Sequence, residues 1–105
     1  MDISVVVPLY NEEESLPELV AWIDRVAVAN GLNYEIIMVD DGSTDRSWEV
    51  VKELSVRYTA IRAISFARNY GKSAALYCGF DMAEGEVVFT MDADLQDSPD
   101  EIPQM

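Results

Sequence analysis

Short hydrophobic runs alternate with longer amphipathic stretches along the whole chain. Four runs rich in β-branched residues predict strands, at 3–7, 34–39, 61–66 and 86–91. The stretches between them predict three helices, with apolar stripes such as Leu16, Leu19, Val20, Ile23, Val26 and Ala27 in the first. The resulting β-α-β-α-β-α-β order predicts an α/β fold, a Rossmann-like parallel sheet with helices on both faces.

Local signals mark several element ends. The run Ser15-Leu16-Pro17-Glu18 is typical of a capping box that opens the first helix, and Gly31 is placed to end it. Ser43 or Thr44 is expected to cap the second helix. The fourth strand is hydrophobic without interruption, a pattern typical of a strand covered on both faces.

Polar clusters follow each predicted strand at its carboxyl end. They are Pro8 to Glu12, Asp40 to Asp45, Arg68 to Lys72 and Asp92 to Asp97. In open parallel sheets, ligands bind at this edge, near the point where the strand order reverses. The sequence therefore predicts one composite site built from these loops.

Asp92 and Asp94 stand at alternate positions directly after the fourth strand. If the backbone stays extended, both carboxylates point the same way, with Cα atoms about 7 Å apart. Two such carboxylates repel each other unless a cation lies between them, and Mg²⁺ or Mn²⁺ favours oxygen ligands. The alternative interpretation is a solvated acidic loop.

Composition excludes several functions. The 105 residues contain 20 acids and 7 bases, a net charge of −13, which argues against nucleic acid and against passive binding to an anionic membrane. The absence of His removes Ser-His-Asp and Cys-His catalysis. Cys78 is expected to be a buried, inert thiol in a reducing compartment. No signal peptide or membrane span is visible.

Five spaced motifs together resemble a known family. Pro8-Leu9-Tyr10-Asn11-Glu12, Asp40 to Asp45 and Asp92-Ala93-Asp94 are similar to inverting nucleotide-sugar glycosyltransferases of family 2, with the GT-A fold. Arg68 to Lys72 and Asp94 to Pro99 resemble its polyprenyl-phosphate branch, which includes dolichyl-phosphate mannose synthases and undecaprenyl-phosphate sugar transferases. The resemblance implies that residues 1–105 are the donor-binding part of a longer domain, truncated at the C-terminus.

The resemblance assigns the nucleotide pocket residue by residue. It implies that Pro8, Tyr10 and Glu12 line the pocket, and that Asp41, with Asp40 beside it, contacts base or ribose. Carboxylates suit this role because they accept hydrogen bonds from ribose hydroxyls and from a base N–H. The alternative for the Asp pair is a tight turn with a helix cap.

The remaining implied roles concern the diphosphate and the metal. Arg68 and Lys72 would neutralise the diphosphate, the alternative for each being an ordinary surface charge. Asp92, Asp94 and Gln96 would lie on the Mg²⁺ or Mn²⁺ side, with Asp94 as the catalytic residue. The donor would be a UDP-sugar or GDP-sugar.

The resemblance also implies a reaction and a location. A polyprenyl phosphate would attack the anomeric carbon with inversion, on the cytoplasmic side of a membrane. Two alternatives stay open: a nucleotide-binding fragment without catalysis, which an exposed fourth strand could drive into a homo-oligomer, and a phosphoacceptor receiver domain. In receiver domains the Asp pair follows the first strand, whereas here it follows the second.

Overall fold

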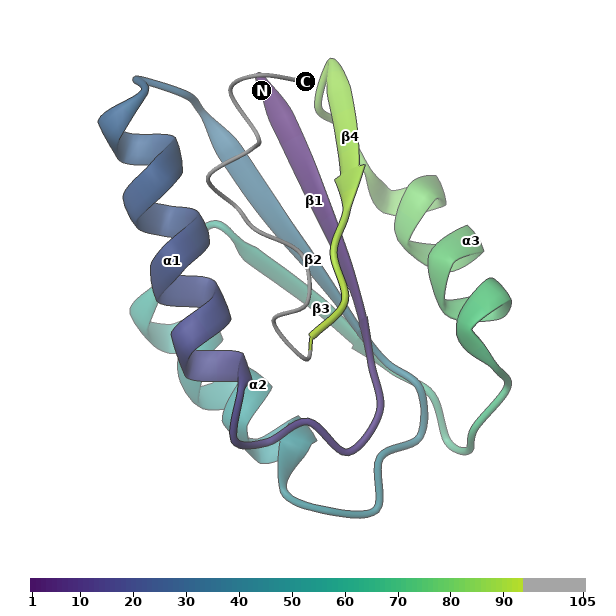
Figure 1. Cartoon of the computed structure of the whole chain (residues 1–105). Coiled ribbons are helices and arrows are strands. Elements are labelled where there is room, and N and C mark those ends of the chain that lie inside the picture. The colour runs from purple at the N-terminus through teal and green to yellow at the C-terminus, as the bar shows by residue number, and fades with distance from the viewer. Residues whose placement is uncertain (94–105) are drawn as a thin grey trace.

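The computed structural model describes residues 1–93 and contains the predicted alternation of strands and helices (Figure 1). The elements are β1 (Ile3–Leu9), α1 (Leu16–Ala29), β2 (Tyr34–Asp40), α2 (Ser47–Arg57), β3 (Ile61–Ser65), α3 (Lys72–Met82) and β4 (Val87–Thr90). All predicted elements are confirmed, with ends that differ by one to a few residues.

The four strands form one parallel sheet in the order β3-β2-β1-β4. The chain moves outward from β1 through β2 to β3 and then returns to place β4 on the other side of β1. The order therefore reverses between β1 and β4, which is where parallel sheets bind ligands. This order also excludes the receiver-domain alternative, because in that fold β3 lies beside β1.

Helices cover both faces of the sheet, as predicted. Figure 1 shows α1 and α2 together on one face and α3 alone on the other. The larger core cluster joins α1 and α2 to side chains such as Val5, Val7 and Met38, whereas Val6, Ile37 and Val39 pack on the α3 face with Ala75. The central strands are hydrophobic throughout because both of their faces are buried.

Of the two expectations for β4, a strand covered on both faces and an exposed strand, the structure contradicts the first and confirms the second for the described residues. Val87 and Val88 are 47% and 40% exposed, and only Phe89 packs against the larger core. The reason is position: β4 is an edge strand whose one neighbour among the described strands is β1 (Figure 1). Continuous hydrophobicity alone does not distinguish such an edge from a central strand.

Both capping predictions were also wrong. The Ser15 side chain makes no cap hydrogen bond in α1; its hydroxyl donates instead to the Ala93 carbonyl and so ties the start of α1 to the chain after β4. The second helix begins at Ser47, later than predicted, and the Ser47 N–H donates to Asp45 Oδ1 at 2.8 Å. Cys78 is half-buried rather than buried.

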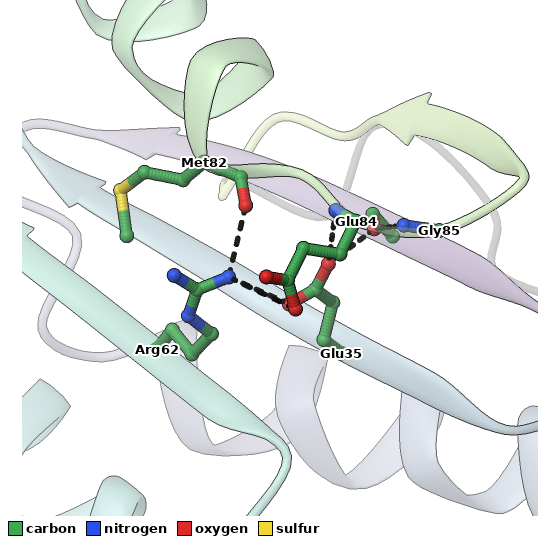
Figure 2. A network of polar contacts seen from close by, with 6 residues as sticks. Glu35, Arg62, Met82, Glu84 and Gly85 are labelled. Carbon is green, nitrogen blue, oxygen red and sulfur yellow. Dashed lines mark hydrogen bonds and ion pairs between the residues drawn. The ribbon is translucent and has the colours of Figure 1, made fainter. Parts of the chain in front are cut away.

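A buried carboxylate organises the edge of the sheet opposite the polar loops. Glu35, at the start of β2, is 2% exposed and accepts hydrogen bonds from Ser4 Oγ at 2.5 Å and from the Glu84 N–H at 2.7 Å. Arg62 Nη1 lies 3.1 Å from Glu35 Oε1 and also donates to the Met82 carbonyl at 2.9 Å (Figure 2). The network therefore joins three strands to the turn between α3 and β4.

This network predicts a pH-dependent contribution to stability. Burial raises the pKa of Glu35, but the hydrogen bonds from Ser4, Glu84 and Arg62 outweigh it and hold the pKa below its usual value. A carboxylate with a depressed folded-state pKa stabilises the protein above its unfolded pKa of about 4.3, and that stabilisation is lost as the pH falls through the folded value.

We therefore expect Glu35→Gln to lower the free energy of unfolding more at neutral pH than in acid. Urea titrations of both proteins between about pH 7 and about pH 3 give this difference directly. Acid destabilises both proteins through their other carboxylates, so the difference isolates Glu35. A difference that stays constant across this range would contradict the assignment.

Candidate functional site

Segments at the carboxyl ends of all four strands meet beside β1 and β4 and line a cavity of 270 Å³. Its lining consists of Pro8, Leu9, Tyr10, Glu12, Asp41, Lys72, Asp92 and Ala93. Six of these eight were predicted from the sequence as site residues, and they come from four separate segments of the chain. The cavity lies at the reversal of the strand order, as the parallel-sheet rule predicts.

The Asp41 side chain binds the backbone of a neighbouring loop. It is 5% exposed, and its two carboxylate oxygens accept the N–H groups of Tyr70 at 2.8 Å and Gly71 at 3.0 Å. The Asp41 N–H donates to the Leu9 carbonyl at 2.8 Å. Each carboxylate oxygen has further acceptor capacity, so Asp41 holds the loop before α3 while still facing the cavity.

Asp40 is placed differently from Asp41. It is 1% exposed, and its Oδ1 accepts the Ser43 N–H, three residues further on, at 3.0 Å, a local side-chain-to-backbone bond that holds the turn. Asp40 does not line the cavity. The turn interpretation therefore describes Asp40, whereas Asp41 is the member of the pair that reaches the candidate site.

Gly42 allows two loops to approach at backbone distance. Its φ is +76°, and a β-carbon there would lie 2.3 Å from the Arg68 carbonyl carbon and 2.4 Å from the Asn69 nitrogen. Only glycine fits both the left-handed backbone and this contact. The 40–45 loop is thus pressed against the 68–71 loop, in the same place where Asp41 binds it.

Among residues 1–93, the only basic side chain lining the cavity is Lys72, the first residue of α3. Its Nζ lies 2.6 Å from Asp92 Oδ1, directly after β4. Lys72 is 61% exposed and Asp92 36% exposed, so water screens the pair and its direct contribution to stability is small. The contact shows that the Asp92 carboxylate holds a cation at the mouth of the cavity.

The structure does not bring every predicted residue to the cavity. The Arg68 guanidinium lies over the Tyr70 ring, 4.9 Å from its centroid, and is not part of the lining. Asp94 and Gln96 lie outside the described residues. Sequence reasoning missed Leu9 and Ala93 as lining residues, because neither side chain carries a chemical group that draws attention.

Acidic side chains surround the cavity on one side. A neighbouring hollow of 310 Å³ is lined by Asn11, Glu12, Glu13, Glu14, Ser15 and Asp45. Partial burial raises the pKa of Asp45, but hydrogen bonds from the Ser47 hydroxyl and backbone lower it by more. The pKa of Asp45 is therefore below its usual value, and the side chain is ionised at neutral pH. Every charged side chain among the described residues that line this hollow is acidic.

Comparison with known proteins identifies the class. A family model described as glycosyl transferase family 2 matches residues 4–105. The chain therefore belongs to glycosyltransferase family 2, as its motifs indicated.

Individual relatives narrow the similarity. The chain is 46% identical over 104 residues to the undecaprenyl-phosphate 4-deoxy-4-formamido-L-arabinose transferase of Pseudomonas aeruginosa, covering 98% of this chain and 31% of that protein. It is 44% identical to the enzyme of the same name from Edwardsiella ictaluri, covering 98% and 32%. These matches confirm the resemblance to the polyprenyl-phosphate branch. The chain spans about a third of the length of these relatives.

Solved structures confirm the fold class. S. aureus TarS is 26% identical with a TM-score of 0.80, aligned over 99% of this chain and 30% of that chain. A mannosyltransferase from Pyrobaculum calidifontis, in complex with GDP-Man and Mn²⁺, is 28% identical with a TM-score of 0.82, over 95% and 30%. Both are glycosyltransferases of the GT-A fold. Within residues 1–93, no helix has the length and apolar character needed to cross a bilayer.

Proposed function

We propose that this chain is the donor-binding part of an enzyme that transfers a sugar from a nucleotide diphosphate sugar to a polyprenyl phosphate with inversion. One observation carries the proposal. Six predicted site residues from four segments converge on a single cavity at the strand-order reversal, in a chain whose relatives are named undecaprenyl-phosphate sugar transferases. Two structural neighbours, S. aureus TarS in complex with UDP-GlcNAc and the Pyrobaculum calidifontis mannosyltransferase in complex with GDP-Man, support a nucleotide-sugar donor.

Different residues around the cavity would bind different parts of the donor. Tyr10, 44% exposed at the rim, offers an aromatic face on which a base stacks. Asp41 and Glu12 offer acceptor oxygens for a base N–H or ribose hydroxyls. Lys72 lies across the cavity beside Asp92 and supplies positive charge for the diphosphate. The donor would lie across the cavity with its diphosphate toward α3 and β4.

The residues present fit a bound Mg²⁺ or Mn²⁺. Asp92 already holds a cation, the Lys72 ammonium, and its carboxylate is the kind of hard oxygen ligand that these ions prefer. No cluster of three metal-ligating side chains occurs within residues 1–93, so Asp92 would share the ion with Asp94 and Gln96 and with donor phosphate. When bound, the metal neutralises charge that builds on the departing nucleoside diphosphate.

The acceptor requires little activation by the protein. A phosphate monoester has a second pKa of about 6, so its oxygens are largely ionised at neutral pH. Such a nucleophile attacks without transferring a proton to the enzyme, unlike a sugar hydroxyl. Catalysis would then rest on positioning and on charge stabilisation.

Nucleotide titration tests this proposal. We expect UDP or GDP, but not both with equal affinity, to bind the chain more tightly with Mn²⁺ than without it. Calorimetry of each nucleotide, with and without the metal, measures this. In Asp94→Ala the Mn²⁺-dependent part of the affinity should disappear, because one of the ion's proposed ligands is missing.

Two results would oppose the proposal. Equal binding with and without Mn²⁺ would remove the metal from the donor site. If neither UDP nor GDP binds a chain that circular dichroism shows to be folded, donor binding by these residues is contradicted. Binding without sugar transfer by the full-length protein would instead favour the alternative of a nucleotide-binding domain without catalysis.

A further inference from the structure

Asn11 occupies an unusual position between two lining residues of the cavity. It is the only non-glycine residue with positive φ among residues 1–93, with φ at +53°. Its neighbours Tyr10 and Glu12 both line the cavity, while Asn11 itself does not. A left-handed backbone at residue 11 turns the chain sharply between them and so sets the directions of both side chains. Asparagine tolerates this conformation better than most residues.

The Asn11 side chain explains why that backbone is held. Its Oδ1 accepts the Thr44 N–H at 2.8 Å and the Asp45 N–H at 3.2 Å, both in the loop after β2. The Thr44 hydroxyl lies 3.4 Å from the same oxygen. One amide oxygen therefore binds two consecutive backbone N–H groups more than thirty residues away.

Side chains after β2 also bind backbone N–H groups of the loop after β1. Ser43 Oγ accepts the Asn11 N–H at 2.9 Å, and Ser47 Oγ accepts the Glu12 N–H at 2.9 Å. Side chains of each loop thus bind backbone groups of the other, in both directions. We call this set of contacts, between Asn11 and Glu12 on one loop and Ser43 to Ser47 on the other, the reciprocal latch.

The latch is one of two connections made by the 40–45 loop. On its other side, Asp41 binds the N–H groups of Tyr70 and Gly71, and Gly42 touches the backbone of residues 68 and 69. The loop after β2 therefore joins the first loop to the loop that begins α3. Its contacts with both loops set how the segments that carry Tyr10 and Lys72 lie relative to each other.

We propose that Asn11 is a positioning residue of the donor site: through the reciprocal latch, its amide oxygen sets the backbone that directs Tyr10 and Glu12 into the cavity. This inference rests on the proposed function. Asn11 would not touch the nucleotide itself, and its effect would reach the nucleotide only through Tyr10 and Glu12. Loss of the latch lowers affinity by freeing the 10–12 backbone, which binding must then order again.

Three substitutions at residue 11 separate the side chain from the backbone. Asn11→Gly keeps the left-handed conformation without strain but removes the acceptor oxygen. Asn11→Asp keeps both, since Asp also tolerates this conformation and its carboxylate accepts the same N–H groups, which lie just before the N-terminus of α2. Asn11→Ala removes the acceptor and adds backbone strain.

The experiment measures nucleotide affinity in the presence of Mn²⁺ by calorimetry, with each chain shown to be folded by circular dichroism. We expect about a tenfold loss of affinity in Asn11→Gly, a greater loss in Asn11→Ala, and affinity within about twofold of the original in Asn11→Asp. Gly31→Ala serves as the control, because it strains a positive φ of +66° just before β2, at the amino ends of the strands and away from the cavity. It should lower stability and leave affinity unchanged.

Hydrogen exchange of the Thr44 and Asp45 amides reports on the latch itself. Their exchange should accelerate in Asn11→Gly and return toward the original rate in Asn11→Asp. Unchanged affinity in Asn11→Gly, with the original chain binding nucleotide, would overturn the inference and leave the proposed function standing. Equal losses in Asn11→Gly and Asn11→Asp would also overturn it. Failure of the original chain to bind nucleotide would overturn both.

Discussion

Replacing Gly42 by Ala should lower the free energy of unfolding by about 2–4 kcal/mol, a large share of the 5–15 kcal/mol typical of a domain. Two costs add. A left-handed backbone disfavours any residue with a β-carbon, and the new carbon would lie 2.3 Å from the Arg68 carbonyl carbon. Because that neighbour is backbone, it cannot rotate away; one of the two loops must move.

Gly31→Ala is the matched control for this substitution. Gly31 also has positive φ, at +66°, but a β-carbon there meets nothing within 4 Å. Its expected cost of about 1–2 kcal/mol is therefore that of the backbone conformation alone. The excess in Gly42→Ala measures the close approach of the two loops. Urea unfolding followed by circular dichroism gives both values, and equal losses in the two variants would contradict the contact.

Nucleotide affinity should change in only one of these two variants. Moving the 40–45 loop away from residues 68–71 disturbs the bonds from Tyr70 and Gly71 to Asp41, and with them the cavity wall. Gly31 precedes the amino end of β2, whereas the lining residues lie at the carboxyl ends of the strands. A loss of affinity in Gly42→Ala alone would show that the loop contact serves the site as well as stability.

The sequence predicted the fold because its signals are local. Hydrophobic period, β-branched composition and helix length are all read within one element, and the alternation of elements then restricts the topology. The hydrophobic pattern alone could not decide whether β4 is buried or exposed. Val87 to Thr90 is as hydrophobic as a central strand, and its exposure follows from the strand order, which depends on the whole chain.

The candidate site was predicted in part for the same reason. Pro8, Tyr10, Glu12, Asp41, Lys72 and Asp92 belong to motifs that follow strands, so the parallel topology brings them together. Asn11 and Gly42 were missed as functional residues because their partners lie roughly thirty residues away. A single Asn or Gly in a loop carries no local sign of such a partner. Ser15 was assigned to a cap because its real acceptor, the Ala93 carbonyl, lies 78 residues further along the chain.

Asp92→Asn should reduce sugar transfer by the full-length protein by about 100-fold or more. Removing one group that stabilises developing charge in a reaction commonly costs a factor of about 10²–10³ in rate. Asn keeps the size of the side chain and removes its negative charge, so the proposed metal loses an anionic ligand. The Mn²⁺ concentration that gives half the maximal rate should rise accordingly, which a metal titration of the initial rate measures.

Asp92 has a second role that a control must separate from the first. Its Oδ1 lies 2.6 Å from Lys72 Nζ, so Asp92→Asn also weakens that ion pair. Lys72→Met breaks the same pair from the other side while leaving the Asp92 carboxylate in place. If Asp92 binds the metal, Lys72→Met weakens binding of the donor diphosphate but keeps the original Mn²⁺ requirement, whereas Asp92→Asn changes that requirement.

Asp81→Asn, an exposed acid on α3, controls for net charge. Equal losses in Asp92→Asn and Lys72→Met, with the same Mn²⁺ requirement in both, would mean that Asp92 serves only to hold Lys72, and the metal would then have to be bound elsewhere.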